Sequence, residues 1–238
     1  MNYFNDDFLN ILTQSFDIYL KTNARSNEKL KILHQKIAND LKNKLDLFNS
    51  FNTFEIFAYG INEGNEKKIK GRYYDKKVDI AIFKNTKQYA GIAVKFVMSN
   101  YAQNSNNYFE NMLGETANLR ANKISYFQIL IVPEMMPYFS KENKIIKIEE
   151  LKLHHLKKYI SLSNDNENLF FHTPNKTLLV IIQLPDFKNI QNKLDYQKMC
   201  LGKRLNYSQK FQFNLGSSLI LNNYDAFLNK VAHAILAV

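Results

Sequence analysis

Two apolar, strand-like segments joined by a short polar turn constrain the fold of this 238-residue chain most strongly. Residues 78–83 alternate between two sets of side chains, and residues 89–98 form a second β-like segment after the polar residues 84–88. A period of two is typical of a β-strand, and a short polar connection favours antiparallel pairing. The sequence therefore predicts a β-hairpin at residues 78–98.

Helix-like and strand-like segments surround this hairpin. Apolar residues at three- and four-residue steps, or helical composition, predict helices at residues 8–20, 27–48, 107–122, 149–160 and 224–238. Aromatic and β-branched runs predict further strands at residues 54–59, 126–132 and 178–184. This order predicts an α/β fold with a central mixed β-sheet flanked by helices.

Composition indicates one globular unit. The chain has only 7 Gly and 4 Pro, and no linker-like stretch divides it. We expect a single domain over residues 1–238, with a core at about 27–132 and a carboxy-terminal elaboration at about 133–238. One cysteine cannot form an intramolecular disulfide, and the apolar runs are much shorter than the roughly 20 residues of a membrane helix. A cytoplasmic protein that does not enter a membrane is the expectation.

The charge balance favours an anionic partner. The chain carries 32 Lys and Arg against 22 Asp and Glu, a formal net charge of +10. Such an excess is typical of proteins that bind nucleic acid or acidic lipid. Codons rich in A and T also enrich a chain in Lys and Asn, so the charge is equally compatible with mutational bias.

Two charged residues interrupt the apolar hairpin. Asp79 lies among apolar residues of the first strand, and Lys95 lies between Val94 and Phe96 of the second. A carboxylate or an ammonium at such a position needs compensation. One interpretation is a buried salt bridge between the two. The other is a divalent-metal hydrolytic site, in which the carboxylate binds the cation and the ammonium activates water or stabilises phosphate charge.

Other chemical motifs are missing from the sequence. It contains no phosphate-binding Gly-x-x-x-x-Gly-Lys, no Gly-x-Gly-x-x-Gly, no Gly-x-Ser-x-Gly and no His-Glu-x-x-His. The five histidines have no metal-ligand spacing, so we expect structural roles for them. These are His34, His154, His155, His172 and His233.

The hairpin resembles the PD-(D/E)xK nuclease superfamily, which includes type II restriction endonucleases. The resemblance rests on Asp79, a hairpin turn and Lys95 at the end of an x-x-Lys run, and it covers residues 27–132. It implies a restriction endonuclease-like core that hydrolyses double-stranded DNA with Mg²⁺. Asp79 would bind the metal, the carbonyl of Val94 would be a further ligand, and Lys95 would position or activate water.

Ala93 departs from that pattern, because the family has Glu or Asp there. One account is a Glu-to-Ala substitution at position 93 that removes cleavage and keeps binding. A second places the missing carboxylate on the following helix, at Glu110. A third is a naturally non-cleaving, DNA-binding relative. Glu28, near the start of a predicted helix, is either a further ligand or a helix-capping residue.

Polar and basic segments around the hairpin are the candidate DNA contacts. A basic run precedes Asp79, an Asn-rich segment expected to be a loop follows Lys95, and a basic-aromatic segment lies at 203–213. The candidate residues are Lys70, Arg72, Lys76, Asn100, Gln103, Asn104, Asn106, Lys203 and Arg204. Since the resemblance implies cutting of both strands of a symmetric site, we also expect a homodimer.

Overall fold

The computed structural model describes residues 3–22, 26–48, 53–61, 66–185, 187 and 190–237. Its helices are α1 (Tyr3–Lys21), α2 (Glu28–Phe48), α3 (Tyr101–Arg120), α4 (Leu153–Ser163), α5 (Lys193–Cys200) and α6 (Tyr224–Leu236). Its longer strands are β1 (Glu55–Ala58), β4 (Ile80–Lys84), β5 (Lys87–Phe96), β6 (Ser125–Pro133), β7 (Met135–Phe139), β8 (Ile145–Glu150) and β9 (Lys176–Gln183). Short strands are β2 (Lys68–Ile69), β3 (Lys76–Lys77), β10 (Asn206–Tyr207) and β11 (Leu219–Leu221).

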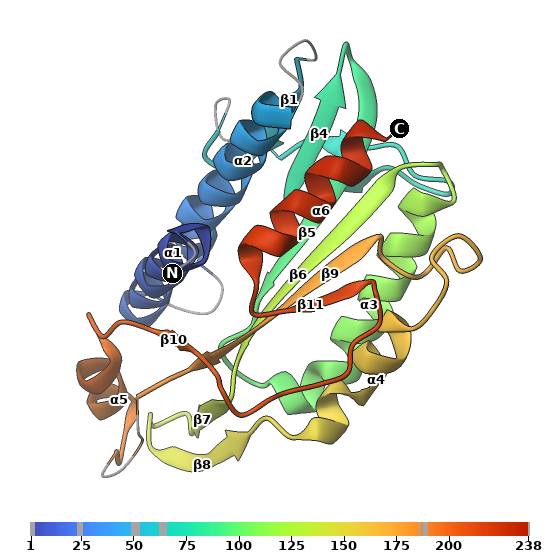
Figure 1. Cartoon of the computed structure of the whole chain (residues 1–238). Coiled ribbons are helices and arrows are strands. Elements are labelled where there is room, and N and C mark those ends of the chain that lie inside the picture. The colour runs from blue at the N-terminus through green and yellow to red at the C-terminus, as the bar shows by residue number, and fades with distance from the viewer. Residues whose placement is uncertain are drawn as a thin grey trace.

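A mixed sheet forms the centre of the molecule (Figure 1). Its order is β1-β4-β5-β6-β9-β10, and β11 also pairs with β9. The pairs β1–β4, β4–β5 and β9–β10 are antiparallel, whereas β5–β6 and β6–β9 are parallel. The predicted α/β fold with a mixed central sheet flanked by helices is confirmed.

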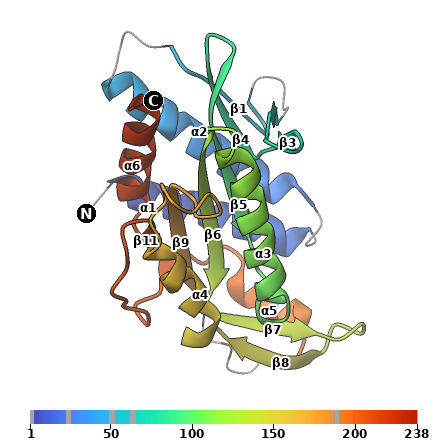
Figure 2. The same cartoon turned by 90° about the vertical axis from the view of Figure 1, so that its right-hand side faces the viewer.

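Helices cover both faces of this sheet, as the two views show (Figures 1 and 2). One face packs against α1, α2 and α6, and its core contains fully buried side chains such as Phe8, Ile37 and Phe227. The other face packs against α3 and α4. The strands in between are apolar on both sides, which is typical of a sheet covered by two layers of helices.

The predicted hairpin is present as β4 and β5. Lys84 pairs with Lys87 at its tip, and the two residues between them, Asn85 and Thr86, have φ angles of 49° and 67°. Two successive positive φ angles are the signature of the type I′ turn, whose twist matches that of antiparallel strands. The hairpin register aligns Ile80 with Ile92 and so fixes where Asp79 meets β5.

The Asn-rich segment after Lys95 is not the expected loop. Only Asn100 lies outside the helix, at its N-cap with a φ of 55°, and α3 begins at Tyr101. The side chains of Tyr101 and Ser105 are buried one turn apart, so packing of this face overrides the weak helix propensity of asparagine. Gln103, Asn104 and Asn106 therefore belong to the first turns of α3.

The chain after residue 132 contributes to the central sheet. β9 lies beside β6, and α6 packs against α2. The region expected as an elaboration thus supplies a central strand and a covering helix. Glu149 and Glu150, expected at the start of a helix, are instead the end of β8, where they pair with Met136 and Met135 of β7. Among the described residues, none of the helices combines the length and the apolar composition of a membrane span.

Candidate functional site

Asp79 occupies a bend immediately before β4 and is partly buried. Its Oδ2 accepts a hydrogen bond of 2.6 Å from the backbone N–H of Val94 on β5. The bend removes residue 79 from the regular β ladder, and its side chain replaces the backbone as the acceptor for Val94. The carboxylate is therefore held in a fixed position at the open end of the hairpin.

Lys95 follows Val94 on β5 and is also partly buried. Neighbouring lysines form ion pairs, Lys76 with Glu115 at 2.7 Å and Lys77 with Glu66 at 3.0 Å. Within the described ranges no such pair joins Asp79 to Lys95. The two charges lie at one corner of the sheet without the salt bridge of the structural interpretation.

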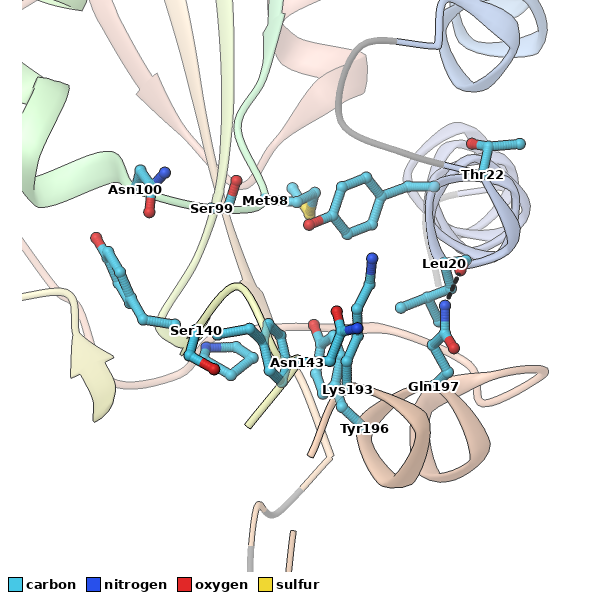
Figure 3. Close-up of a pocket in the computed structure, with 14 residues that line it drawn as sticks. Leu20, Thr22, Met98, Ser99, Asn100, Ser140, Asn143, Lys193, Tyr196 and Gln197 are labelled. Atoms are coloured by element: carbon cyan, nitrogen blue, oxygen red, sulfur yellow. Dashed lines mark hydrogen bonds between the residues drawn. The ribbon is translucent and has the colours of Figure 1, made fainter. Parts of the chain in front are cut away.

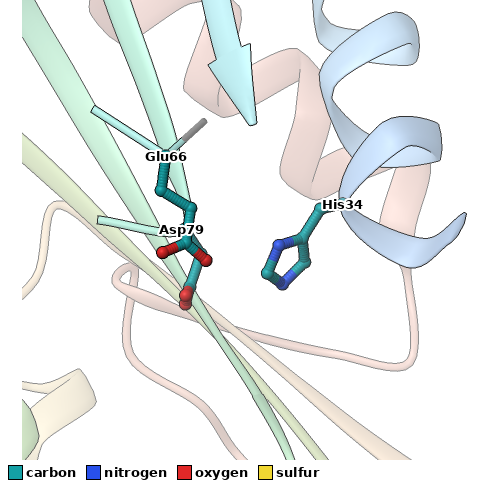
Figure 4. Close-up of side chains that lie close together, drawn as sticks. All are labelled: His34, Glu66 and Asp79. Atoms are coloured by element: carbon teal, nitrogen blue, oxygen red, sulfur yellow. The ribbon is translucent and has the colours of Figure 1, made fainter. Parts of the chain in front are cut away.

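Two further side chains complete this corner (Figure 4). His34 points from α2 toward the carboxylates, and Glu66 lies in the segment before β2. One ligand atom from each of His34, Glu66 and Asp79 lies within 4.8 Å of the others, close enough for a single metal ion to be bound by all three. We call these three residues the corner cluster.

His34 is the unusual member of the corner cluster. Its side chain is 0% exposed, and neither Nδ1 nor Nε2 has a hydrogen-bond partner among the described residues. Burial lowers the pKa of His34 below its ordinary value of 6.5, the charges of Asp79 and Glu66 act in the opposite direction, and Lys95 lowers it further. The ring is therefore neutral near pH 7, the form in which imidazole binds a metal.

Position 93 lies on the face of β5 that α3 covers. Ala93 is 3% exposed and packs with Leu119 of α3 and Tyr126 of β6. In register beside it lies Gln128 of β6, whose buried Nε2 has no hydrogen-bond partner in the described part of the chain.

The structure does not group Glu110 with Asp79. Glu110 is exposed, and its charge acts on Lys158 of α4. Glu115 is the α3 carboxylate that faces the sheet, where its Oε2 accepts a hydrogen bond of 3.3 Å from the Tyr126 hydroxyl. Five helical residues separate the two, about 140° around the axis, so they point in different directions. Glu28 is likewise exposed, in the first turn of α2, and is not in the corner cluster.

The basic run before Asp79 forms an ordered surface segment around β2 and β3. Asn118 of α3 holds it: Asn118 Oδ1 accepts from Tyr73 N at 2.9 Å, and Asn118 O accepts from Arg72 N at 2.8 Å. Gly71 is required for this approach, because a Cβ there would lie 2.2 Å from Asn118 Nδ2. Lys70 and Arg72 have exposed side chains, whereas Lys76 is engaged by Glu115.

The remaining candidate DNA contacts are dispersed. Gln103 is exposed on α3, and Asn106 accepts a hydrogen bond of 2.9 Å from Lys158. Asn104 bonds to the carbonyl of Asn100. Lys203 and Arg204 follow α5, and Arg204 pairs with Asp6 at 3.2 Å. Figure 2 shows α5 at the other end of the molecule from β3, so this basic-aromatic segment is separate from the corner cluster.

A cavity of about 290 Å³ lies beyond the end of β5 (Figure 3). The end of α1, the connection from β5 to α3, β7 and α5 contribute its walls, which include Tyr19, Ser99, Asn100 and Lys193. Neither Asp79 nor Lys95 lines it. Asn100, one of the candidate contact residues, is exposed and contributes to the wall of this cavity.

Sequence reasoning missed His34 and Glu66. One signal for His34 was present, because it lies on the apolar stripe of α2 between Leu33 and Ile37, where a polar ring needs a partner. Glu66 carried no signal, since it precedes a two-residue strand in a polar segment.

Comparison of the chain with protein-family models, with curated proteins and with solved structures finds no significant match.

Proposed function

We propose that this chain is a metal-dependent DNA endonuclease that hydrolyses phosphodiester bonds with a PD-(D/E)xK-like site. The observation that carries the proposal is the corner formed by the hairpin: Asp79 fixed on Val94 N, Lys95 one residue further along β5, and two more metal-ligand side chains beside them. This convergence of carboxylates, imidazole and ammonium is suited to phosphoryl chemistry.

Each residue has a defined part in this reaction. Asp79, with Glu66 and His34, would hold the divalent cation, expected from the resemblance to be Mg²⁺, and the carbonyl of Val94 would add a ligand. When bound, the cation would supply Lewis acidity and would lower the pKa of a water molecule. Lys95 would orient the attacking water or stabilise the negative charge that develops on the phosphate.

Charge supports DNA as the substrate. The net charge is +10, and Lys68, Lys70 and Arg72 present exposed side chains on the segment that leads into Asp79. Phosphate contacts of this kind give sequence-independent affinity that falls steeply with added salt. A symmetric double-stranded target would be met by a homodimer, and site-specific cleavage is part of the proposal.

A second candidate is a DNA-binding protein without cleavage activity. Ala93 favours it, because the family's second carboxylate is missing there and the alanine packs against Leu119 and Tyr126. Binding would then use the same basic segment, with Asp79 and Lys95 retained for structure.

Cleavage of supercoiled plasmid DNA tests the first candidate. The parent and Ala93→Glu are assayed with Mg²⁺ or Mn²⁺, and at least one of them should cleave. Lys95→Met should remove that cleavage, whereas Lys87→Met, on the exposed start of the same strand, should not. Binding without cleavage in both proteins would establish the second candidate. If neither protein binds or cleaves DNA at low salt, both candidate functions are excluded.

A further inference from the structure

The corner cluster contains an unsatisfied buried imidazole, and this observation goes beyond the resemblance. Burying a polar ring without hydrogen bonds costs roughly 1 to 3 kcal/mol. His34 is fully buried, and neither ring nitrogen is bonded within the described residues. A structural histidine would have a hydrogen-bond partner. An imidazole aimed at two carboxylates is arranged as a ligand that awaits a cation (Figure 4).

The charges at the corner are suited to a dication. Asp79 and Glu66 contribute two negative charges, and His34 is a neutral nitrogen donor. Lys77 compensates Glu66 across 3.0 Å, but its side chain is 59% exposed and can turn into solvent. A bound dication would therefore displace an ammonium that loses little by leaving, because exposed ion pairs contribute little free energy.

Ligand type discriminates between metals. Mg²⁺ prefers an all-oxygen shell, whereas first-row transition dications accept imidazole, with affinity that rises along the series from Mn²⁺ to Co²⁺. One nitrogen and two carboxylates are a mixed set. Together with Asp79, His34 and Glu66 give the corner three possible ligands without any side chain from position 93.

We propose that His34, Glu66 and Asp79 form a mixed nitrogen–oxygen site that binds a first-row transition-metal dication in preference to Mg²⁺. This proposal deepens the proposed nuclease function, because it assigns the cation of the same site. Its test is metal binding in the absence of DNA, so the two can fail separately.

Isothermal titration of the metal-free full chain with MnCl₂, CoCl₂ and MgCl₂ provides the test. We expect one site with the order Co²⁺ tighter than Mn²⁺ tighter than Mg²⁺. His34→Gln should lower the affinity for Mn²⁺ and for Co²⁺ by at least about tenfold. Even the loss of an outer-shell partner of a metal ligand lowers metal affinity by about this factor. Mg²⁺ affinity should change less, so the spread between the ions should shrink. Lys77→Gln should tighten all three ions.

Control variants separate a lost ligand from a damaged fold. His233→Gln removes an exposed imidazole from α6 and should leave all affinities unchanged. Glu66→Gln tests the cluster if His34→Gln proves unstable by circular dichroism, because Glu66 lies in a surface segment. Glu66→Gln should lower the affinity of the chain for each of the three ions.

Three results would overturn the proposal: no Mn²⁺ binding, Mg²⁺ bound as tightly as Mn²⁺, or equal Mn²⁺ affinity in the parent and in His34→Gln. His34-dependent Mn²⁺ binding in a chain that never cleaves DNA would support the metal site and reject the nuclease. Mg²⁺-dependent cleavage that is unchanged in His34→Gln would support the nuclease and reject the proposed metal site.

Discussion

Asp40 and His34 are two buried polar side chains on α2 that differ in their hydrogen bonding. Asp40 is 4% exposed and has two partners, Lys36 Nζ at 2.9 Å from Oδ1 and the Tyr224 hydroxyl at 2.9 Å from Oδ2. His34, six residues or about 9 Å earlier along the helix, has none among the described residues.

The surroundings of the two residues explain the difference. Asp40 lies where α1 and α6 close over α2, and Lys36 also bonds to Asp7 there. Burial raises the pKa of Asp40, and Lys36 and Tyr224 act against that increase. His34 instead faces the corner where the hairpin places two acids. A buried polar group satisfied within the chain stabilises a helix junction, whereas one left unsatisfied beside carboxylates indicates a ligand site.

The largest expected effect is on catalysis. Asp79→Asn should lower DNA cleavage on the order of 10³-fold, because a metal ligand is lost and metal binding is worth several kcal/mol in the transition state. The amide oxygen can still accept from Val94 N–H, so the fold should persist. Cleavage rates against Asp75→Asn, an exposed neighbour, measure this. Equal rates in the two variants would remove Asp79 from the site.

The next largest effect is expected on the free energy of unfolding when Asp40 is replaced. Asp40→Ala should lower the free energy of unfolding by about 2 to 3 kcal/mol, since Lys36 and Tyr224 lose a charged hydrogen-bond acceptor. Asp46→Ala breaks an exposed α2 pair with Lys42 and should cost no more than about 0.5 kcal/mol. Urea denaturation of both variants decides whether Asp40 is a structural residue.

His34→Leu should change the stability in the opposite direction from Asp40→Ala. Replacing an unsatisfied buried ring by an apolar side chain should raise the stability of the metal-free chain by about 1 kcal/mol. The variant should also lose the increase in Tm that Mn²⁺ gives the parent. Thermal denaturation with EDTA and with Mn²⁺ measures both. A destabilised variant in EDTA would mean that His34 has a structural partner.

A smaller effect is expected with pH. Because the folded pKa of His34 lies below the ordinary 6.5, the unfolded chain binds more protons there. The contribution of His34 to stability is therefore complete above about pH 6.5 and is lost as the pH falls below it. Urea midpoints between pH 7 and pH 5 should fall more steeply for the parent than for His34→Leu. Parallel curves would contradict the lowered pKa.

The smallest effect is expected at Glu110. Glu110→Gln should change stability by less than about 0.5 kcal/mol, and cleavage and metal affinity should remain the same, because its side chain is exposed and near Lys158. Plasmid cleavage and titration check this. A clear loss of metal affinity would bring Glu110 back as the migrated carboxylate.

The sequence allowed prediction of the hairpin, because alternation and the polar turn act locally, and of Asp79 and Lys95, because charges in apolar strands are conspicuous. It did not reveal the start of α3, where burial of Tyr101 and Ser105 outweighs propensity, nor β8, whose pairing partner β7 lacks a clear pattern. His34 and Glu66 were out of reach because they approach Asp79 only through the packing of α2 and of the segment before β2 on the hairpin.

One measurement tests the central claim most directly. A crystal of the full chain soaked in MnCl₂ is measured at the manganese absorption edge, and the anomalous difference map is inspected at the corner of the hairpin. We predict a peak bound by His34, Glu66 and Asp79, near the ammonium of Lys95. An empty corner in a crystal that shows manganese elsewhere would contradict the assignment.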